Sequence, residues 1–450
     1  MRRPIGCCLG LFGLVVLCVV FAALFRRDPG FAGFAGGGGF VRGGPFYKPF
    51  LLLPHQSGDA AAAPSVAQST SNNAQTQSDT DAPWGPPLPR VRAAFATLCP
   101  RVADRPDNLP CNGGGASSGH ALRRLRPVLP ASVGPSLRAS PPCGPGNVVA
   151  RLRVGDAVRM GAPHLYHMFL DEFARRPPIC TYPAREDKWV SRSLQNAGIW
   201  DAPLAQFFVR TLTQPHQGGG GIVVDVGANV GAMTLLSASL GFRTFAFEAS
   251  RRTARMLART VRMNGLESRV TVLNNALGDG LYYSRLIVPK DNRGGSALGL
   301  SREEFGVNIN EKAGATIHED RVSVVCLDTM VDYLDVVLPA EGLPRVVTLM
   351  KIDVERLEPL VLRGGAEFFS RFDVRTIVLE ISSFGWSVIG CEVKGVVGAL
   401  LEIGYVMSTQ DGALVRNTAE FEHWSGKIHL EKTQVNVVFT RKQQHHRVKL

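Results

Sequence analysis

Four acidic side chains each follow a short apolar run of the sequence, and together they could do chemistry. They are Asp225, Glu248, Asp353 and Glu380. Short apolar runs are typical of buried strands, and ligands of open α/β sheets bind outside the carboxyl ends of the strands. We therefore expect these carboxylates to surround one crevice. Such a cluster suits a cationic ligand, and it can supply a general base for a hydroxyl nucleophile.

The third of these acids has an acidic neighbour. Asp353 and Glu355 alternate with Val354, so both carboxylates can point to the same side of the strand end. We predict that Asp353 or Glu355 takes the proton from the nucleophile. The alternative is structural: the acids here, Glu355 and Glu380 above all, cap helices or pair with nearby cations, namely Lys351, Arg356 and Arg363.

The first two acids frame the most informative stretch of the chain, residues 222–248. An apolar run ends at Asp225, a glycine turn follows, apolar residues then recur at helical spacing, and a second apolar run ends at Glu248. This order indicates strand, turn, helix and strand, the first half of a doubly wound sheet. Gly227 allows the sharp bend, and Gly231 allows the helix and the strand to pack closely.

The turn also indicates the ligand. A helix N-terminus presents unpaired N–H groups, and Glu248 is placed to accept hydrogen bonds from ribose hydroxyls. A dinucleotide site has a second glycine where this chain has Asn229, and Asp225 is poorly placed for a phosphate. We therefore predict S-adenosylmethionine (SAM), which has a sulfonium and an amino-acid tail. The predicted cofactor contacts are Asp225, Gly227, Ala228, Asn229, Gly231, Glu248, Asn275 and Ala276.

The stretch VDVGANVGAMTLLSASLGFRTFAFEA resembles the SAM-binding motif of class I methyltransferases of the FkbM family. Further segments resemble that family in the same order: Val270–Asp279, Gly294–Leu298, Val322–Met330, Leu349–Gly365 and Val374–Ser382. The chain departs from the family at Arg356, because the family usually reads Asp-Val-Glu-Gly at this point.

The resemblance implies an α/β fold, a class I doubly wound sheet that is mostly parallel with an antiparallel edge strand, over residues 218–450. It implies that helices of a preceding extension, residues 147–217, cover the cofactor. It places Asn275 in a hydrogen bond to the adenine and Ala276 in simple contact with it. A turn-capping amide is the alternative for Asn275. Residues 281–289 and 322–327 resemble strands of an inserted hairpin, and we expect the loop between them to face the substrate.

The N-terminal third of the chain looks different. Pro4–Phe25 contains no charged residue and is long enough to span a bilayer, which takes about 20 residues. We predict a signal anchor over residues 1–27, with a cleaved signal as the alternative. Residues 28–146 are rich in Gly, Pro, Ala and Ser, so we predict a disordered, flexible stem. The flanking charges favour a single-pass type II protein with its catalytic domain in the Golgi or ER lumen.

Whether the cysteines form disulfides depends on that membrane orientation. In a lumen, Cys99, Cys111, Cys143 and Cys180 are disulfide candidates, and four cysteines permit three pairings. Cys326 and Cys391 lie in apolar, core-like segments, so we expect them to be buried and free.

The formal net charge of +12 predicts attraction to polyanions or anionic membranes, unless the charge is simply dispersed over a solvated surface. We find no module typical of nucleic-acid binding, and methyl transfer from a sulfonium requires no metal. The sequence thus predicts a membrane-anchored, SAM-dependent O-methyltransferase. A glycan hydroxyl is the preferred acceptor by analogy. An inactive adaptor of the same fold and an NAD oxidoreductase are the alternatives, and the oligomeric state stays open.

Overall fold

The computed structural model describes residues 85–99, 111, 124–128, 143–162, 176–214, 221–299, 316–409, 412–427 and 434–442. All of them lie in one unit, Gln77–Leu450. The predicted membrane anchor, residues 1–27, lies outside the described residues. Within the described part of the chain, no helix is both long enough and apolar enough to cross a membrane.

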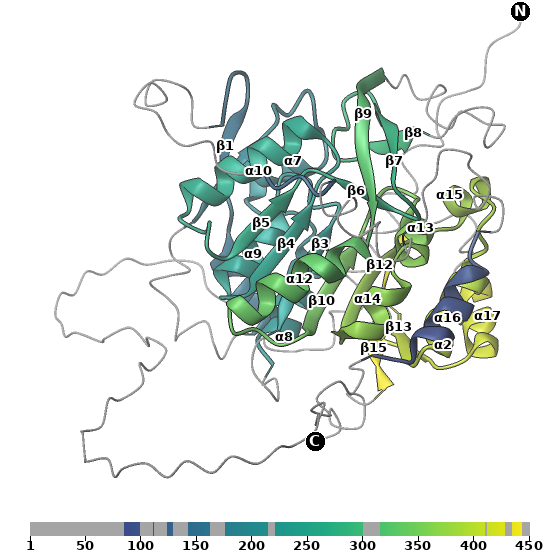
Figure 1. Ribbon diagram of the computed structural model, residues 1–450. Coiled ribbons are helices and arrows are strands. Elements are labelled where there is room, and N and C mark those ends of the chain that lie inside the picture. Colours follow the sequence, from purple (N-terminus) through teal and green to yellow (C-terminus); the bar gives the residue numbers. More distant parts are fainter. Residues whose placement is uncertain are drawn as a thin grey trace, which may run out of the picture. The chain divides into compact units, whose positions relative to one another are not determined.

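A mixed sheet lies at the centre of the unit (Figure 1). Its nine strands in the described residues follow the order β14-β13-β15-β12-β10-β3-β4-β5, and β11 pairs with β10. Their bounds are β3 Ile222–Val226, β4 Arg243–Phe247, β5 Val270–Leu273, β10 Val346–Ile352, β11 Asp373–Val374, β12 Thr376–Ser382, β13 Tyr405–Ser408, β14 Leu414–Val415 and β15 Gln434–Arg441.

Strand β3 lies between β4 and β10, and all three run parallel. Strand β15 runs antiparallel to β12. The prediction of an antiparallel edge strand is confirmed at β14, which pairs antiparallel with β13 at the end of the sheet. Strand β15 lies inside the sheet, because β13 pairs with its far side. Both flanking strands are apolar, so β15 is more stable with its two edges paired than with one edge exposed.

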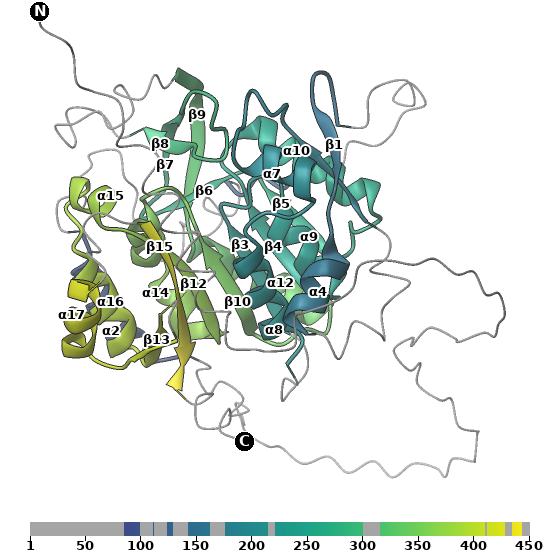
Figure 2. The same cartoon turned by 180° about the vertical axis from the view of Figure 1, so that it is seen from behind.

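Helices cover both faces of the sheet, as the views from opposite sides show (Figures 1 and 2). Along β3, Ile222, Val224 and Val226 pack into one core, whereas Val223 packs into the other. This alternation explains why the strand is apolar throughout. The helices are α2 Leu88–Ala96, α4 Val154–Gly161, α7 Val190–Ala197, α8 Ala202–Leu212, α9 Ala232–Ser239, α10 Arg251–Met263, α12 Thr329–Ala340, α13 Glu358–Arg363, α14 Ala366–Arg371, α15 Ser383–Val388, α16 Val393–Glu402 and α17 Thr418–Lys427.

A second sheet has the order β6-β9-β7-β8. Its strands are β6 Ala276–Gly278, β7 Tyr282–Val288, β8 Ala297–Gly299 and β9 Thr316–Cys326. The antiparallel pair β7 and β9 confirms the inserted hairpin expected from the sequence. The extension contains helices, as predicted: α7 and α8 follow one another, with Gly198 at φ 67° between them. A two-stranded sheet, β1 Val148–Arg151 and β2 Pro178–Thr181, completes the extension.

The prediction of a disordered stem over residues 28–146 is wrong for residues 85–99. This segment forms α2, whose Val91 and Phe95 are buried in the core. The Phe95 ring meets the Phe369 ring edge to face at 5.4 Å. Gly85 N also donates to the Ser370 carbonyl. The segment is stable here because its few apolar residues pack on a domain that is already folded.

Three disulfides fasten the N-terminal segments to the domain: Cys99–Cys391, Cys111–Cys326 and Cys143–Cys180. The expectation that Cys326 and Cys391 are free is wrong. Both are buried, as expected, but each pairs with a cysteine more than two hundred residues away in the sequence, at separations of 215 and 292. Composition could not reveal such partners, since a bonded cysteine and a free one are equally apolar.

Candidate functional site

A cavity of about 410 Å³ opens where β3, β4, β10 and β12 end. Its volume is typical of a small-molecule site, for which the usual range is roughly 300–1,000 Å³. All the residues predicted from the sequence to bind cofactor or to act as base line it, except Gly231. The lining residues among them are Asp225, Gly227, Ala228, Asn229, Glu248, Asn275, Ala276, Asp353 and Glu355.

The glycine turn has the geometry expected from its sequence. Gly227 and Gly231 have φ values of 79° and 94°, which glycine adopts readily. A methyl group at Gly227 would overlap the carbonyl oxygen of Asp353, and one at Gly231 would overlap Leu257. Asn229, with φ 52°, turns its Oδ1 to accept from Val230 N at 2.8 Å. The turn thus brings β3 against the acidic end of β10 and against α10.

Within the described residues, one carboxylate oxygen of Asp225 accepts a hydrogen bond and the other accepts none. Its side chain is 1% exposed, and Oδ2 accepts a 2.6 Å hydrogen bond from the Thr234 hydroxyl. Oδ1 has no hydrogen-bond partner within the described residues, and the Lys351 Nζ lies 3.9 Å from it. Burial raises the pKa of Asp225, whereas Lys351 opposes that shift. A cationic amino group in the cavity would satisfy this oxygen.

Glu248 and Asn275 line the cavity near the ends of β4 and β5, and they differ in the hydrogen bonds that they make. The Glu248 oxygens accept from Asn229 N at 2.9 Å and from Ser250 N at 2.8 Å. Because Glu248 lines the cavity, a ribose hydroxyl there can reach its carboxylate. Ala276, 8% exposed, is placed for the simple contact that we predicted.

The Asn275 amide is used by the protein itself. Its Nδ2 donates to the carbonyls of Arg124 and Ser323, and its Oδ1 accepts from Arg126 N. Both amide protons are therefore taken, whereas Oδ1 can accept one more hydrogen bond. The predicted hydrogen bond from Asn275 to adenine stays a prediction. In the structure this buried amide ties the 124–128 segment to the wall of the cavity.

Two predicted bases and a third acid gather at the ends of β10 and β12. Lys351 Nζ lies 3.0 Å from Asp353 Oδ2, so Asp353 is ion-paired. Burial, with Asp353 and Glu358 nearby, raises the pKa of Glu355 to about 8. Burial and the same acids raise the pKa of Glu380 to about 9. Glu355 and Glu380 therefore hold protons near neutral pH unless a cation enters the cavity.

Sequence reasoning missed Glu358, which shapes the loop that carries these acids. Its Oε1 accepts from Val354 N at 2.9 Å and Arg356 N at 3.1 Å, and its Oε2 accepts from Trp386 Nε1 at 2.8 Å. Burial raises its pKa to about 7. The one signal in the sequence is an acid two residues after Arg356, and nothing in its spacing shows that it binds backbone N–H groups of the preceding loop.

Oxygens of Asp353, Glu358 and Glu380 lie within 4.8 Å of one another, close enough in principle to hold a metal ion. Glu358 already accepts three protein hydrogen bonds, so it is poorly suited to be a ligand. The expectation that the site uses no metal stays a prediction.

Parts of the extension and of the inserted loop cover the cavity. Trp189 and Trp200 line it, which agrees with the covering role expected for the extension. Lys188 N donates to the Asp291 carbonyl at 2.9 Å, and the neighbouring residues 292–296 also line the cavity. Of the sequence-predicted loop, residues 300–315 lie outside the described part.

Comparison with known proteins agrees with this geometry. Residues 225–407 match the family model of the methyltransferase FkbM domain. No curated protein and no solved structure matches the chain. The matched residues begin at the buried Asp225 and run through the strands and loops that form the acidic end of the cavity. The chain therefore carries a methyltransferase FkbM domain over residues 225–407.

Proposed function

We propose that the protein is a SAM-dependent O-methyltransferase. The observation that carries the proposal is the Asp225 carboxylate. The residue lines the cavity, and its buried Oδ1 lacks a hydrogen-bond partner within the described residues. The cofactor's α-amino group would donate to it, and Glu248 would accept from the ribose. When bound, SAM supplies a methyl group on a positively charged sulfur that leaves as a neutral thioether.

The acidic end of the cavity suits a hydroxyl acceptor. Asp353 is ion-paired with Lys351, which leaves Glu355 and Glu380 as the groups that can exchange a proton at neutral pH. Bringing a positive charge into the cavity lowers the pKa of both carboxyls, because opposite charges favour the ionised form. We assign Glu355 as the base that receives the hydroxyl proton, since it lies on the same loop as Asp353 and lines the cavity. Holding the methyl donor and the hydroxyl acceptor in the reactive geometry supplies much of the remaining rate acceleration.

The disulfides support a luminal placement of the domain. All six cysteines that follow the apolar segment are paired, and disulfides of this kind persist in oxidising compartments. We propose that Pro4–Phe25 anchors the protein in a Golgi or ER membrane and that the acceptor is a glycan hydroxyl of the secretory pathway.

The test is methyl transfer by the full-length protein from labelled SAM to panels of glycans and lipids, together with calorimetric SAM binding. Asp225→Asn keeps the shape of the side chain but removes its charge. We expect it to weaken SAM binding by about 10- to 100-fold, as for loss of a charge-assisted hydrogen bond of roughly 1.5–3 kcal/mol. Glu267→Gln, at an exposed position, is the control and should bind SAM normally.

Three results would overturn the proposal. Unchanged SAM affinity in Asp225→Asn would mean that the carboxylate does not hold the cofactor. Tight binding of NAD in place of SAM by the wild-type protein would favour an oxidoreductase. Binding of SAM without transfer to any hydroxyl would favour an inactive adaptor.

A further inference from the structure

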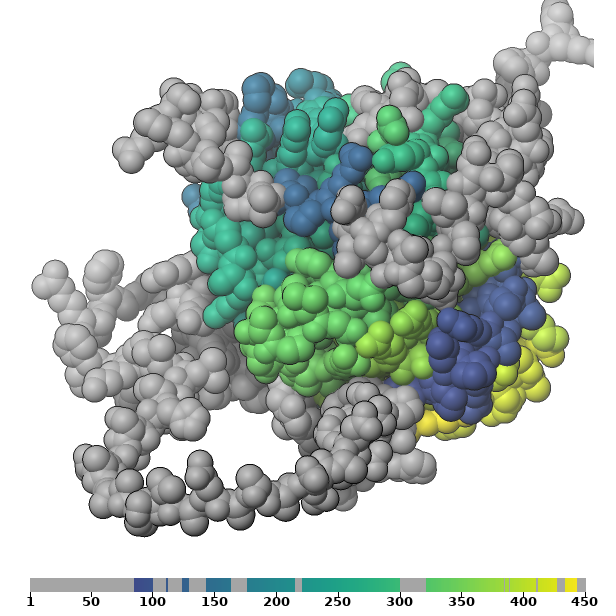
Figure 3. Space-filling view, in the orientation of Figure 1, coloured from purple at the N-terminus to yellow at the C-terminus, as the bar shows by residue number. Residues whose placement is uncertain are grey.

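Helix α10 carries five arginines and no acidic residue. They are Arg251, Arg252, Arg255, Arg259 and Arg262. At 3.6 residues per turn these positions fall within an arc of about 100° on the helix surface. We call this set the α10 arginine stripe. Arg251, Arg255 and Arg259 are exposed, and the other two are half-buried. Figure 1 shows the helix beside β4 and β5, and Figure 3 shows the surface of the molecule in the same orientation, with this part of the chain in teal.

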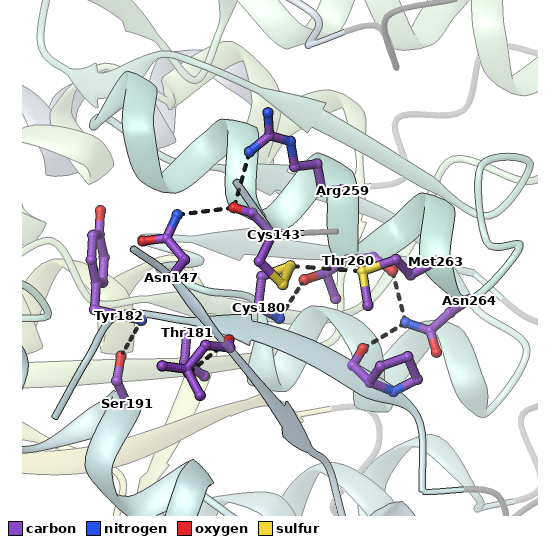
Figure 4. Close-up of a disulfide and its surroundings, with 12 residues drawn as sticks. Cys143, Asn147, Cys180, Thr181, Tyr182, Ser191, Arg259, Thr260, Met263 and Asn264 are labelled. Atoms are coloured by element: carbon purple, nitrogen blue, oxygen red, sulfur yellow. Dashed lines mark hydrogen bonds between the residues drawn. A yellow bond between two sulfur atoms is a disulfide. The ribbon is translucent and has the colours of Figure 1, made fainter. Parts of the chain in front are cut away.

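The side of α10 opposite the stripe packs against the domain, so the helix cannot rotate and the stripe faces outward. Leu257 and Val261 are buried in the core. The Thr260 hydroxyl accepts from Cys180 N at 2.9 Å, and Asn264 donates to the Pro178 carbonyl at 2.8 Å. Figure 4 shows these contacts beside the Cys143–Cys180 disulfide. Packing therefore sets which side of the helix faces outward.

Repulsion among the arginines of the stripe lowers the stability of the helix, although Arg252 and Arg259 bond to other parts of the chain. Like charges four residues apart, such as Arg251, Arg255 and Arg259, destabilise a helix by about 0.2–0.5 kcal/mol per pair. Arginines at the helix N-terminus also oppose the helix dipole, and the first turn contains no acid to offset them. The side chains of Arg255 and Arg262 make no hydrogen bond or ion pair within the described part of the chain. Their charge is available to a partner.

The stripe continues to the rim of the cavity. Arg252 Nη1 lies 3.1 Å from Glu186 Oε2, and Arg293 Nη2 lies 3.6 Å from the same oxygen. Both guanidinium groups stack over the Tyr182 ring, at 4.6 and 5.4 Å from its centroid. Arg293 itself lines the cavity. One carboxylate, Glu186, thus faces two arginines where the stripe meets the site, and the remaining positive charge runs outward along α10.

We propose that the α10 arginine stripe docks a linear anionic polysaccharide that carries sulfate or carboxylate groups. Guanidinium groups bind such oxyanions through paired hydrogen bonds. Arg251 and Arg259 are eight residues apart, which is about 12 Å along a helix, so the stripe extends over several charges of a polymer. Anionic lipids are concentrated in the cytoplasmic leaflet. The choice of a glycan over a membrane therefore rests on the luminal placement proposed above, whereas the docking itself does not require methyl transfer.

The experiment measures the salt concentration at which the full-length protein elutes from immobilised heparin. The test variant is Arg251→Gln, Arg255→Gln and Arg262→Gln together; Arg259 is kept because it donates to the Cys143 carbonyl. The matched control is Arg92→Gln, Arg210→Gln and Arg416→Gln, three exposed arginines outside α10. Both variants lose three positive charges. A third variant replaces the three stripe arginines with lysine. Vesicles with and without phosphatidylserine form a separate arm.

We expect the test variant to elute at clearly lower salt than the control variant and to keep the melting temperature of the wild type. The lysine variant should elute between the test variant and the wild type, because it keeps charge but loses the paired hydrogen bonds. Equal elution of the two glutamine variants would overturn the proposal, since only net charge would then matter. Stripe-dependent binding to anionic vesicles without heparin retention would assign the surface to a membrane instead. These readouts involve no SAM, so they stand apart from the test of the proposed reaction.

Discussion

Arg356 occupies a backbone position that favours glycine. Its φ is 82°, and the preceding Glu355 has φ 58°. Such angles cost a non-glycine residue about 1–3 kcal/mol unless the surroundings hold them. Here Glu358 Oε1 accepts from Arg356 N at 3.1 Å. The structure also provides space for the side chain, since a methyl group at Gly385 would overlap Cβ, Cγ and Cδ of Arg356. The arginine is thus accommodated by a glycine on α15.

This arrangement predicts a coupling between the two positions. Gly385→Ala alone should lower the free energy of unfolding by about 1–3 kcal/mol, the usual cost of overpacking. Arg356→Gly should remove most of that loss when it is combined with Gly385→Ala. Chemical denaturation of the two single variants and the double variant measures the interaction energy. Additive single effects would show that the two residues do not compete for space.

At the scale of elements, α2 belongs to the catalytic domain although the sequence places it in a low-complexity region. Leu98 and Cys99, directly after the helix, are buried. Arg363 Nη1 donates to the Cys99 carbonyl at 2.9 Å, and the Cys99–Cys391 bond joins this point to the segment before α16. The helix therefore acts as part of the packing around α14 and α16.

We predict that Phe95→Ala lowers the free energy of unfolding by about 3–5 kcal/mol, as for other large-to-small core changes at buried aromatic residues. The matched control in the same helix is Arg92→Ala, which is exposed and should change stability by no more than about 0.5 kcal/mol. Thermal and chemical denaturation of both variants provide the measurement. If Phe95→Ala were as stable as its control, α2 would be a loosely attached part of a stem.

At the scale of the whole molecule, the carboxyl cluster makes stability depend on pH. The pKa values of Glu358, Glu355 and Glu380 are raised to about 7, about 8 and about 9, from the ordinary value of 4.5. Between 4.5 and those values the folded protein holds protons that the unfolded chain has released. Unfolding then releases protons, so the free energy of unfolding falls as pH rises through this interval.

The predicted measurement is the free energy of unfolding from pH 5 to pH 9. We expect it to fall with pH in the wild type and to fall less steeply in Glu355→Gln/Glu380→Gln, which cannot ionise at these positions. The control is Glu267→Gln, at an exposed position, which should follow the wild type. A wild-type curve that rises over this interval would contradict the raised pKa values of the cluster.

Features that depend on neighbours in the sequence could be predicted from the sequence alone. The β3–turn–α9–β4 unit follows from a glycine turn between two apolar runs, and Gly227 and Gly231 adopt the positive φ values that such a turn needs. The acids at strand ends meet in one cavity because parallel strands place their carboxyl ends at the same edge of a sheet. Asp225, Glu248, Asp353 and Glu355 could be found in this way.

Only the tertiary structure decided the features that depend on distant partners. Cys391 could not be paired from the sequence, because its partner Cys99 lies in a segment with the composition of a linker. The role of Asn275 depends on backbone groups of residues 124–126, which no spacing connects to it. The position of β15 inside the sheet depends on which apolar edge remains unpaired. In each case the stabilising contact joins groups far apart in the chain, and local patterns carry no information about such contacts.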